Sequence, residues 1–268
     1  MRIAALPMYD LPELRGAHDR LWAALAQRLQ AAAITSVPAQ LTRGLSCREI
    51  WSHPALLFGQ ACEYPAARFF RDHLQIVATP RYGAAGCAGT SYRSAIIVRA
   101  DEPANGLEDL RNRRCVANEP DSNSGMNLLR AALAPIARGG RFFESVRFSG
   151  SHRSSMEAVA NGEADVTAVD CVTLAHLQRY QPLLTSRLRV IDWTPASPCL
   201  PFVTTSQVDV AVLQALRVAL EDVFADRALA ADRAELLLEG IDLSPDGTFA
   251  RVRQLERAAE RLHYPTLS

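Results

Sequence analysis

The sequence contains no lysine, so all 29 of its Lys and Arg positions are arginine, and 29 acidic residues balance them. With a formal net charge of zero, nothing in the charge balance favours nucleic acid or an anionic membrane as a partner. The chain also lacks an apolar run of the roughly 18 to 20 residues needed to cross a bilayer. These absences predict a protein that neither binds nucleic acid nor inserts into membranes.

A secretory signal is missing from the given sequence. Residues 1–8 carry one positive charge and a short apolar run that Pro7 interrupts, whereas a signal peptide has a longer apolar stretch and a small-residue cleavage site. Two compartments therefore stay open. The protein is either cytosolic as written or the mature form of an exported protein.

The six cysteines include no CxxC pair, and the two nearest, Cys47 and Cys62, are fifteen residues apart. This spacing excludes a zinc ribbon and a thioredoxin-like motif. Several cysteines have apolar neighbours, which favours buried thiols over disulfides and a reducing compartment. No metal or other cofactor is expected.

Motifs of the common enzyme classes are also absent. Pro120 stands where the first glycine of a GxSxG elbow would precede Ser122, and no HExxH, P-loop or dinucleotide fingerprint occurs. The six histidines are scattered, and only His152 falls at the edge of the expected ligand cleft. We therefore expect that the protein is not an enzyme.

Strands alternating with helices predict an α/β protein with largely parallel sheets. The expected strands are 2–7, 34–41, 56–59, 74–79, 92–100, 114–117, 145–148, 165–169, 188–193 and 201–205. The expected helices are 11–33, 47–52, 64–73, 107–112, 125–138, 154–161, 171–180, 208–224, 228–238 and 249–262. In the helix over 11–33, apolar periodicity predicts a buried stripe, made of Leu14, His18, Leu21, Trp22, Leu25 and Leu29.

At 268 residues the chain is long enough for two compact lobes. The alternation breaks at a Gly/Ala-rich segment (82–92) and at a proline cluster (195–201), which predicts two hinge crossings, near 88–95 and 193–201. Residues 1–90 and 200–268 would form a discontinuous first lobe, and 95–193 the second. We expect a ligand between the lobes, at the carboxyl ends of the strands.

Two segments of the expected second lobe are rich in Ser at the start of a helix: 118–125 and 150–155. The first turn of a helix has backbone N–H groups without intrahelical partners and a partial positive charge. Hydroxyl groups there bind an anion or cap the helix, and Gly125 lets a ligand approach the backbone. The pair of segments predicts a receptor for a small oxyanion. Two ordinary capped helices are the alternative.

A series of motifs covers most of the chain and resembles the substrate-binding components of phosphate and phosphonate ABC transporters. These proteins are the phosphonate-binding type of the type II periplasmic binding fold, and the motifs occur here in the order found in that family. The motifs are Phe58-Gly-Gln60 with Cys62 and Tyr64-Pro65, then 89–94 leading into 96–98, 107–110, Asn118 with 122–125, 150–152, 158–165 and 198–203. The Ser-x-Ser-Gly and Gly-x-His pair, followed by Ala-Val-Ala-Asn, is the most specific part.

The resemblance implies ligand contacts from three sources. The Ser-x-Ser-Gly segment and its neighbours would supply Asn118, Ser122, Asn123, Ser124 and Gly125. The crossover strand would supply Tyr92, and the next helix start Ser151 and His152. Neutral or cationic His152 and the Tyr92 hydroxyl both donate hydrogen bonds to an anion. In the first lobe, Tyr9 and Gln60 are the candidates to close over it.

Two departures from the family pattern concern the ligand. Phe58 stands where aminophosphonate binders often have Tyr, and Asp170 is the sole acidic candidate to hold a ligand amine. A 2-aminophosphonate is therefore disfavoured relative to a plainer phosphonate, phosphate or another small oxyanion.

The resemblance also implies an architecture and a role. Each lobe would be a mostly parallel sheet flanked by helices, and two crossover strands would join the lobes. The implied role is capture of the oxyanion by hinged closure for ABC-type uptake, by a periplasmic monomer that works with a permease. A cytosolic ligand sensor of the same fold is the alternative, followed by an enzyme of the thiamine-pyrimidine type.

Overall fold

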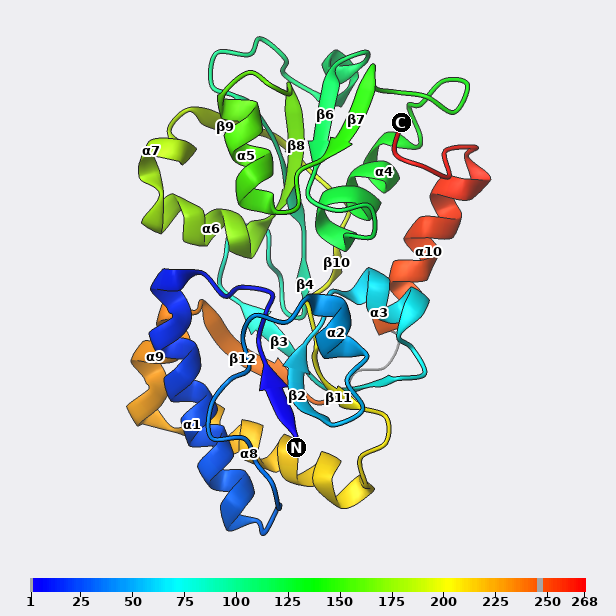
Figure 1. The fold of residues 1–268 in the computed structure, drawn as a ribbon. Coiled ribbons are helices and arrows are strands. Elements are labelled where there is room, and N and C mark those ends of the chain that lie inside the picture. Colours follow the sequence, from blue (N-terminus) through cyan, green and yellow to red (C-terminus); the bar gives the residue numbers. More distant parts are fainter. Residues whose placement is uncertain (1, 245–247) are drawn as a thin grey trace. The chain divides into compact units, whose positions relative to one another are not determined.

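The computed structural model describes residues 2–244 and 248–268. The chain forms two compact units (Figure 1). Unit 1 is Met1–Gly83 with Cys199–Thr248, and unit 2 is Ala84–Pro198 with Phe249–Ser268. Each unit combines strands and helices, as the α/β alternation of the sequence predicts.

Unit 1 contains a five-stranded sheet of order β1-β2-β11-β3-β12. Its strands are β1 (Ile3–Ala5), β2 (Leu56–Gln60), β3 (Leu74–Tyr82), β11 (Phe202–Thr205) and β12 (Leu238–Asp242). β1 and β2 pair in parallel, whereas β11 is antiparallel to both β2 and β3, and β12 is antiparallel to β3. Three strands therefore run in one direction and two in the other.

Helices accompany the sheet of unit 1. They are η1 (Pro12–Leu14), α1 (Arg15–Ala31), α2 (Cys47–Trp51), α3 (Glu63–Phe69), α8 (Val210–Ala225), η4 (Arg227–Leu229) and α9 (Ala230–Glu235). The stripe predicted over 11–33 is buried throughout. In it, Trp22 stacks on Phe58 at 6.0 Å between ring centroids, and Phe58 meets Phe202 at 5.2 Å. Full burial of each such ring contributes about 1.5 to 3 kcal/mol.

Unit 2 contains a second five-stranded sheet, of order β7-β6-β8-β5-β9. Its strands are β5 (Ser94–Arg99), β6 (Arg114–Ala117), β7 (Ser145–Phe148), β8 (Val166–Asp170) and β9 (Leu188–Trp193). β6 pairs in parallel with β7 and β8, while β5 is antiparallel to β8 and β9. Four strands therefore share one direction, and β5 is inserted against them.

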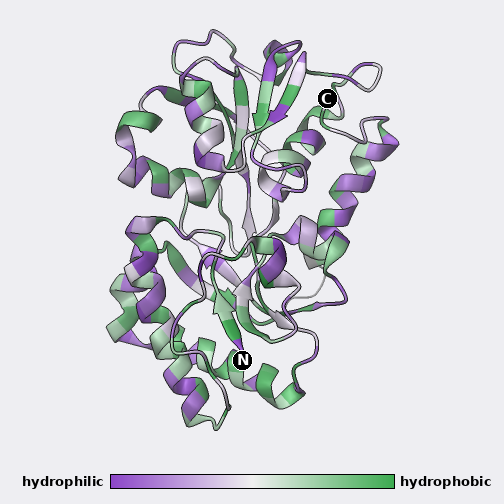
Figure 2. Ribbon diagram, in the orientation of Figure 1, coloured by the Kyte–Doolittle hydropathy of each residue, from purple (hydrophilic) through white to green (hydrophobic). Residues whose placement is uncertain are grey.

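A small antiparallel ladder joins β4 (Ser91–Tyr92) to β10 (Ser197–Pro198) in unit 2. The helices of this unit are η2 (Leu107–Leu110), η3 (Asn123–Asn127), α4 (Leu128–Leu133), α5 (His152–Ala160), α6 (Cys171–Tyr180), α7 (Pro182–Thr185) and α10 (Thr248–Arg261). The strand β8, buried along its whole length, is coloured mainly as hydrophobic in Figure 2, whereas much of α10 is coloured as hydrophilic. The core of unit 2 thus lies around its sheet.

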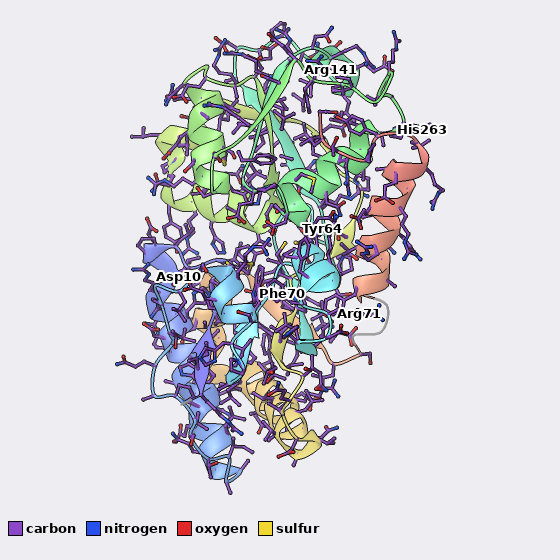
Figure 3. The ribbon with its side chains drawn as sticks, turned by 45° about the vertical axis from the view of Figure 1, so that its right-hand side comes forward. Asp10, Tyr64, Phe70, Arg71, Arg141 and His263 are labelled. Carbon is purple, nitrogen blue, oxygen red and sulfur yellow. The ribbon has the colours of Figure 1, made fainter. Side chains whose placement is uncertain are left out.

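The C-terminal segment belongs to unit 2, whereas the sequence analysis placed it in the first lobe. The carbonyl oxygen of Ser268 accepts hydrogen bonds from the backbone N–H groups of Phe142 (2.8 Å) and Phe143 (3.0 Å). Figure 3 labels Arg141 and His263 on the two segments that meet here. These contacts are non-local, and the helical periodicity of 249–262 carries no information about them.

Two expectations for unit 1 are wrong, and positive φ angles give the reason. The predicted strand over 34–41 is a series of turns, with Ala33 at φ 58° and Ser36 at φ 57°. The helix predicted over 228–238 ends at Glu235, and Leu237, at φ 57°, leads into β12. A left-handed residue stops both a helix and a strand, and helical periodicity does not reveal it.

The expectation of mostly parallel sheets needs correction in its detail. Five of the eight pairings in the two large sheets are antiparallel. β5 and β11 are each inserted antiparallel between strands that share a direction, soon after the chain passes from one unit to the other. Within residues 2–244 and 248–268, no helix has both the length and the apolar character that a membrane span requires.

Candidate anion site in unit 2

The Ser-x-Ser-Gly segment begins the first helix after the strand β6, beyond a short connection over residues 118–122. Ser122 is the N-cap, with an extended backbone (φ −71°, ψ 136°), and its Oγ accepts a hydrogen bond from the Gly125 N–H at 3.1 Å. The first turn, η3, is a π-helical turn that continues into α4. π-Helical turns are rare in proteins, and many of those that occur lie at functional sites. The cap and the π-turn together set the direction in which the Ser122 and Ser124 hydroxyls point.

Gly125 is required by its neighbours in the fold. A Cβ added at this position would lie 1.9 Å from Asn118 Oδ1 and 3.3 Å from His152 Cε1. Asn118 Oδ1 is itself buried and has no hydrogen-bond partner among the described residues. The Asn118 backbone carbonyl accepts from the Gly150 N–H at 2.8 Å, which holds the two Ser-rich segments together.

Ser124 and His152 connect the two helix starts that the sequence analysis singled out. Ser124 Oγ lies 2.8 Å from His152 Nε2, and 3.4 Å from Ser122 Oγ. His152 is the first residue of α5, two residues earlier than the expected helix start. The two Ser-rich segments therefore lie close together in the fold.

Ser151 has a local role in the structure. It is the N-cap of α5, where its Oγ accepts from the Ser154 N–H at 3.0 Å and lies 2.8 Å from the Ser154 hydroxyl. The side chain is exposed. The capped-helix alternative describes Ser151 well, and its contact with a ligand stays a prediction.

Burial lowers the pKa of His152 to about 4, and the backbone of Ala168 offsets part of this effect. The ring is therefore neutral at neutral pH. Of the two charge states that the sequence analysis left open, the neutral one applies here. Neutral His152 donates through one nitrogen only, so its tautomer decides whether Nε2 donates to Ser124 or accepts from it.

Asn123 is fully buried and connects three elements of unit 2. Its Nδ2 donates to the Tyr92 hydroxyl (3.1 Å) and to Ser197 Oγ (2.9 Å), and its Oδ1 accepts from Asn127 Nδ2 (2.9 Å). Tyr92 and Ser197 are cross-strand partners in the β4–β10 ladder. Tyr92 and Asn123 thus contact each other, and they hold the helix start in place.

Sequence reasoning missed Asn127 and Ser197. The spacing of Asn123 and Asn127 at i and i+4 on one helix could have suggested their pairing. Ser197 offers no comparable signal, because its partner lies 74 residues away. Both residues hydrogen-bond to the Asn123 side chain and so help to hold the helix start in place.

Asp170 is the N-cap of α6. Its Oδ1 accepts from the backbone N–H groups of Val172 (2.8 Å) and Thr173 (2.9 Å), and the residue is 2% exposed. Opposite it in the sheet register stands Ser94, whose buried Oγ has no partner among the described residues. Asp170, the acidic candidate from the sequence, therefore uses one carboxylate oxygen to cap α6. Its contact with a ligand amine stays a prediction.

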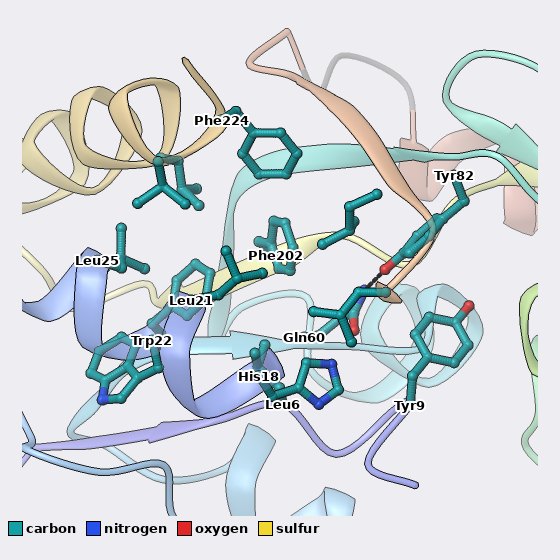
Figure 4. Close-up of a pocket in the computed structure, with 15 residues that line it drawn as sticks. Leu6, Tyr9, His18, Leu21, Trp22, Leu25, Gln60, Tyr82, Phe202 and Phe224 are labelled. Carbon is teal, nitrogen blue, oxygen red and sulfur yellow. Dashed lines mark hydrogen bonds between the residues drawn. The ribbon is translucent and has the colours of Figure 1, made fainter. Parts of the chain in front are cut away.

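The two first-lobe candidates, Tyr9 and Gln60, line a cavity of unit 1 (Figure 4). Gln60 Nε2 donates to the Tyr82 hydroxyl at 2.8 Å and to the Leu200 carbonyl at 3.0 Å. Tyr9 meets Tyr82 edge to face, at 5.5 Å between ring centroids. His18 lines the same cavity, and its buried Nδ1 has no hydrogen-bond partner among the described residues. Tyr9 and Gln60 therefore have packing roles in unit 1, and ligand contact by either stays a prediction.

We expect the stability of the protein to fall as the pH drops from 6.5 towards 4. Burial lowers the pKa of His18 to about 4, as it does for His152, from an ordinary value of 6.5. Between these pH values the unfolded chain binds more protons than the folded chain, so acid favours unfolding. The free energy of unfolding should lose up to about 1.4 kcal/mol per pH unit for each histidine.

Denaturant unfolding at pH 7, 6 and 5, followed by tryptophan fluorescence, measures this slope. The variants His18→Gln and His152→Gln should each remove about half of it. The aspartates with shifted pKa values, such as Asp165, have values below their ordinary 3.8, so they stay ionised in both states between pH 7 and pH 5. A wild-type protein equally stable at pH 7 and pH 5 would contradict the two buried neutral histidines.

No group of three or more His, Cys, Asp or Glu side chains placed to hold a metal ion occurs among the residues that the structure describes. The site in unit 2 consists instead of hydroxyl groups, one imidazole and the backbone N–H groups at the start of a helix. This donor set is suited to an oxyanion.

The chain is similar to a known protein family in sequence pattern and to solved structures in fold. A family model described as ABC transporter, phosphonate, periplasmic substrate-binding protein matches residues 56–244. No curated protein matches the chain. Many solved structures do match it, and three of them are informative.

The binding-protein component of an ABC phosphonate transporter from Pseudomonas aeruginosa is 19% identical, with a TM-score of 0.76 over 97% of this chain and 87% of that one. A Prochlorococcus marinus protein in complex with methylphosphonate is 14% identical, with a TM-score of 0.73 over 97% and 98%. A Xanthomonas citri protein bound to chloride is 17% identical, with a TM-score of 0.74 over 97% and 98%. At these identities the structures show the shared fold.

Proposed function

Because the chain belongs to the family of phosphonate-binding periplasmic substrate-binding proteins of ABC transporters, we propose that unit 2 binds a small phosphonate or similar oxyanion. The binding residues are Ser122, Ser124 and His152, together with the backbone N–H groups of the first turn of η3. Proteins of this kind bind solutes and deliver them, and they are not enzymes.

One observation carries this proposal: the row Ser122–Ser124–His152 at the start of a helix, with neighbouring polar atoms 3.4 and 2.8 Å apart. Each hydroxyl can turn its proton towards a ligand oxygen, and the helix start adds a partial positive charge. Hydrogen bonds to a charged acceptor contribute about 1.5 to 3 kcal/mol each. Three such bonds contribute about 4.5 to 9 kcal/mol in total, and the backbone N–H groups of the helix start add to this sum.

The ligand we propose is an alkylphosphonate or phosphate rather than a 2-aminophosphonate. An amine needs a carboxylate, and in unit 2 the candidate Asp170 uses one oxygen as a helix cap. The relative from Prochlorococcus marinus was solved with methylphosphonate, which supports an alkylphosphonate as the first ligand to test.

We further propose a place and a partner for the protein. The description of its family supports a periplasmic receptor that delivers its ligand to an ABC permease. Among the residues that the structure describes, the site holds no cluster of histidines of the kind expected for the thiamine-pyrimidine-type enzyme, and the family description names a transporter component rather than the cytosolic sensor of the other sequence-based alternative. A monomeric state stays a prediction.

Titration calorimetry with methylphosphonate, phosphate, sulfate and 2-aminoethylphosphonate tests the proposal. We expect methylphosphonate or phosphate to bind most tightly, and to raise the unfolding temperature by mass action at a hundredfold excess over Kd. Absence of binding for all four anions would refute the proposed function.

Replacing Ser124 with alanine should weaken binding of the preferred anion by about 10- to 150-fold, because one hydrogen bond to a charged acceptor, worth about 1.5 to 3 kcal/mol, is lost. The matched control is Ser186→Ala, an exposed serine of unit 2 whose hydroxyl bonds only to the nearby Leu183 carbonyl. Calorimetry should show wild-type affinity for the control. Equal affinities for both variants would remove Ser124 from the site.

A further inference from the structure

Two cysteines of unit 2, far apart in sequence, meet in space. The sulfur atoms of Cys87 and Cys171 lie 3.4 Å apart, although the residues are separated by 84 positions. Cys171 is 1% exposed, whereas Cys87 is half-buried and can be reached from solvent.

The backbone on both sides holds this contact in place. Cys87 lies in a turn in which its N–H donates to the Ala84 carbonyl at 2.9 Å. In that turn Gly86 adopts φ +100°, and a Cβ there would lie 2.5 Å from the Trp193 ring and 3.0 Å from Cys171 Cβ. Only glycine lets the turn approach Cys171 so closely.

Cys171 is held with similar firmness. It is the first residue of α6, directly after the capping residue Asp170, and its N–H donates to the Arg93 carbonyl at 3.2 Å. Closing a covalent S–S bond of about 2.05 Å needs a sulfur movement of roughly 1.4 Å, which side-chain rotation supplies. The two thiols are therefore placed to react with each other.

We propose that Cys87 and Cys171 form a disulfide in the mature protein, generated by exchange with an external disulfide. The proposal is independent of the ligand site. It departs from the preference for buried thiols over disulfides that the sequence suggested, and it identifies a modification site within unit 2.

The exchange proceeds in two balanced steps. The thiolate of the accessible Cys87 attacks an external disulfide, forming a mixed disulfide and releasing one thiol. Cys171 then loses its proton to water and attacks Cys87 Sγ, which forms the intramolecular bond and releases the second thiol. Two protein thiols are oxidised, and one external disulfide is reduced. The hydrogen bond with Cys87 and burial both raise the pKa of Cys171, so Cys171 takes the second, intramolecular step.

The compartment of the family supports this chemistry. Its members are described as periplasmic, and disulfides form and persist in the bacterial periplasm. The bond would join the first residues of unit 2, just after Gly83, to the start of α6. It would thereby stabilise the segment around Gly86 and Trp193 against local unfolding.

Differential alkylation of the wild-type protein tests the proposal without relying on a variant that folds. The purified protein is treated with oxidised glutathione, its thiols are blocked with one alkylating reagent in denaturant, and a second, heavier reagent is applied after reduction. We expect the heavier label on the peptides of Cys87 and Cys171 alone. The intact oxidised protein should weigh less than the reduced protein by two hydrogen atoms.

Two variants give an independent readout. In Cys87→Ser, which alters the more accessible partner, the heavier label should disappear from Cys171. In the control Cys199→Ser, which changes another buried cysteine, the heavier label should stay on both Cys87 and Cys171. Oxidation should raise the unfolding temperature of wild type by several degrees and leave that of Cys87→Ser unchanged. Two outcomes would overturn the proposal. One is labelling of both Cys87 and Cys171 by the first reagent, which would show that they remain thiols. The other is a mixed disulfide between Cys87 and glutathione that persists without attack by Cys171.

Discussion

Replacing Asn123 with alanine should destabilise unit 2 by about 3 kcal/mol and weaken anion binding at least 100-fold. The change removes one hydrogen bond each from the Tyr92 hydroxyl, Ser197 Oγ and the Asn127 side-chain amide. A buried polar group left unsatisfied costs about 1 to 3 kcal/mol, and some of these groups will find new partners. The sum therefore exceeds the cost of one hydrogen bond.

The effect on binding follows from position. Asn123 is the first residue of η3, between Ser122 and Ser124, and its side chain ties this helix start to the β4–β10 ladder. Without it, the hydroxyl groups no longer keep the spacing that the anion requires. A displacement of about 1 Å at a site that depends on several hydrogen bonds is enough to abolish most of its affinity.

The measurement is denaturant unfolding together with calorimetry of the preferred anion. A matched control is Asn161→Ala, an exposed asparagine at the end of α5 that accepts one long hydrogen bond from Arg187. The control should lose less than about 0.5 kcal/mol of stability and no affinity. Similar stability losses in the two variants would show that the buried network around Asn123 does not hold the site together.

Replacing Gly125 with alanine should also reduce anion affinity at least 100-fold, for a different reason. The new Cβ would lie 1.9 Å from Asn118 Oδ1, so either the Asn118 side chain or the first turn of the helix has to move. His152, 3.3 Å from the same point, limits the movement on the other side. Overpacking of this kind costs about 1 to 3 kcal/mol of stability, and it displaces the backbone N–H group that Ser122 accepts from.

Two further variants make the test specific. Gly106→Ala is the matched control, because a Cβ there meets nothing within 4 Å and the backbone is extended at φ −162°. It should bind the anion as wild type does. The double variant Gly125→Ala/Asn118→Ala removes the clashing atom and should recover part of the lost stability. Full affinity in Gly125→Ala would show that the ligand does not use this helix start.

The local parts of the site were predictable from sequence for a simple reason. Ser122, Ser124 and Gly125 act within one helical turn, and capping depends on residues that are three apart in the chain. His152 was predictable in the same way, as the start of the next helix. The strands β6, β7 and β9, and the helix α6, also match the predicted bounds, because each is a short apolar or periodic run between turn residues.

Other features depend on partners far along the chain. The contact of Asn123 with Ser197 spans 74 residues, and that of Cys87 with Cys171 spans 84. The C-terminal segment joins unit 2 through Ser268 and the backbone of Phe142. The sequence pattern of each segment is compatible with several neighbours, so no pattern selects the right one.

The sequence by itself determined the α/β class, the two Ser-rich helix starts and their suitability for an anion, because these follow from periodicity and capping within a few residues. Tertiary structure alone decided which buried groups meet: His152 becomes neutral through burial, Asn123 acquires its partners, and two cysteines come into contact. Burial and long-range pairing depend on how whole segments pack, and packing is a property of the complete fold rather than of any single stretch of residues.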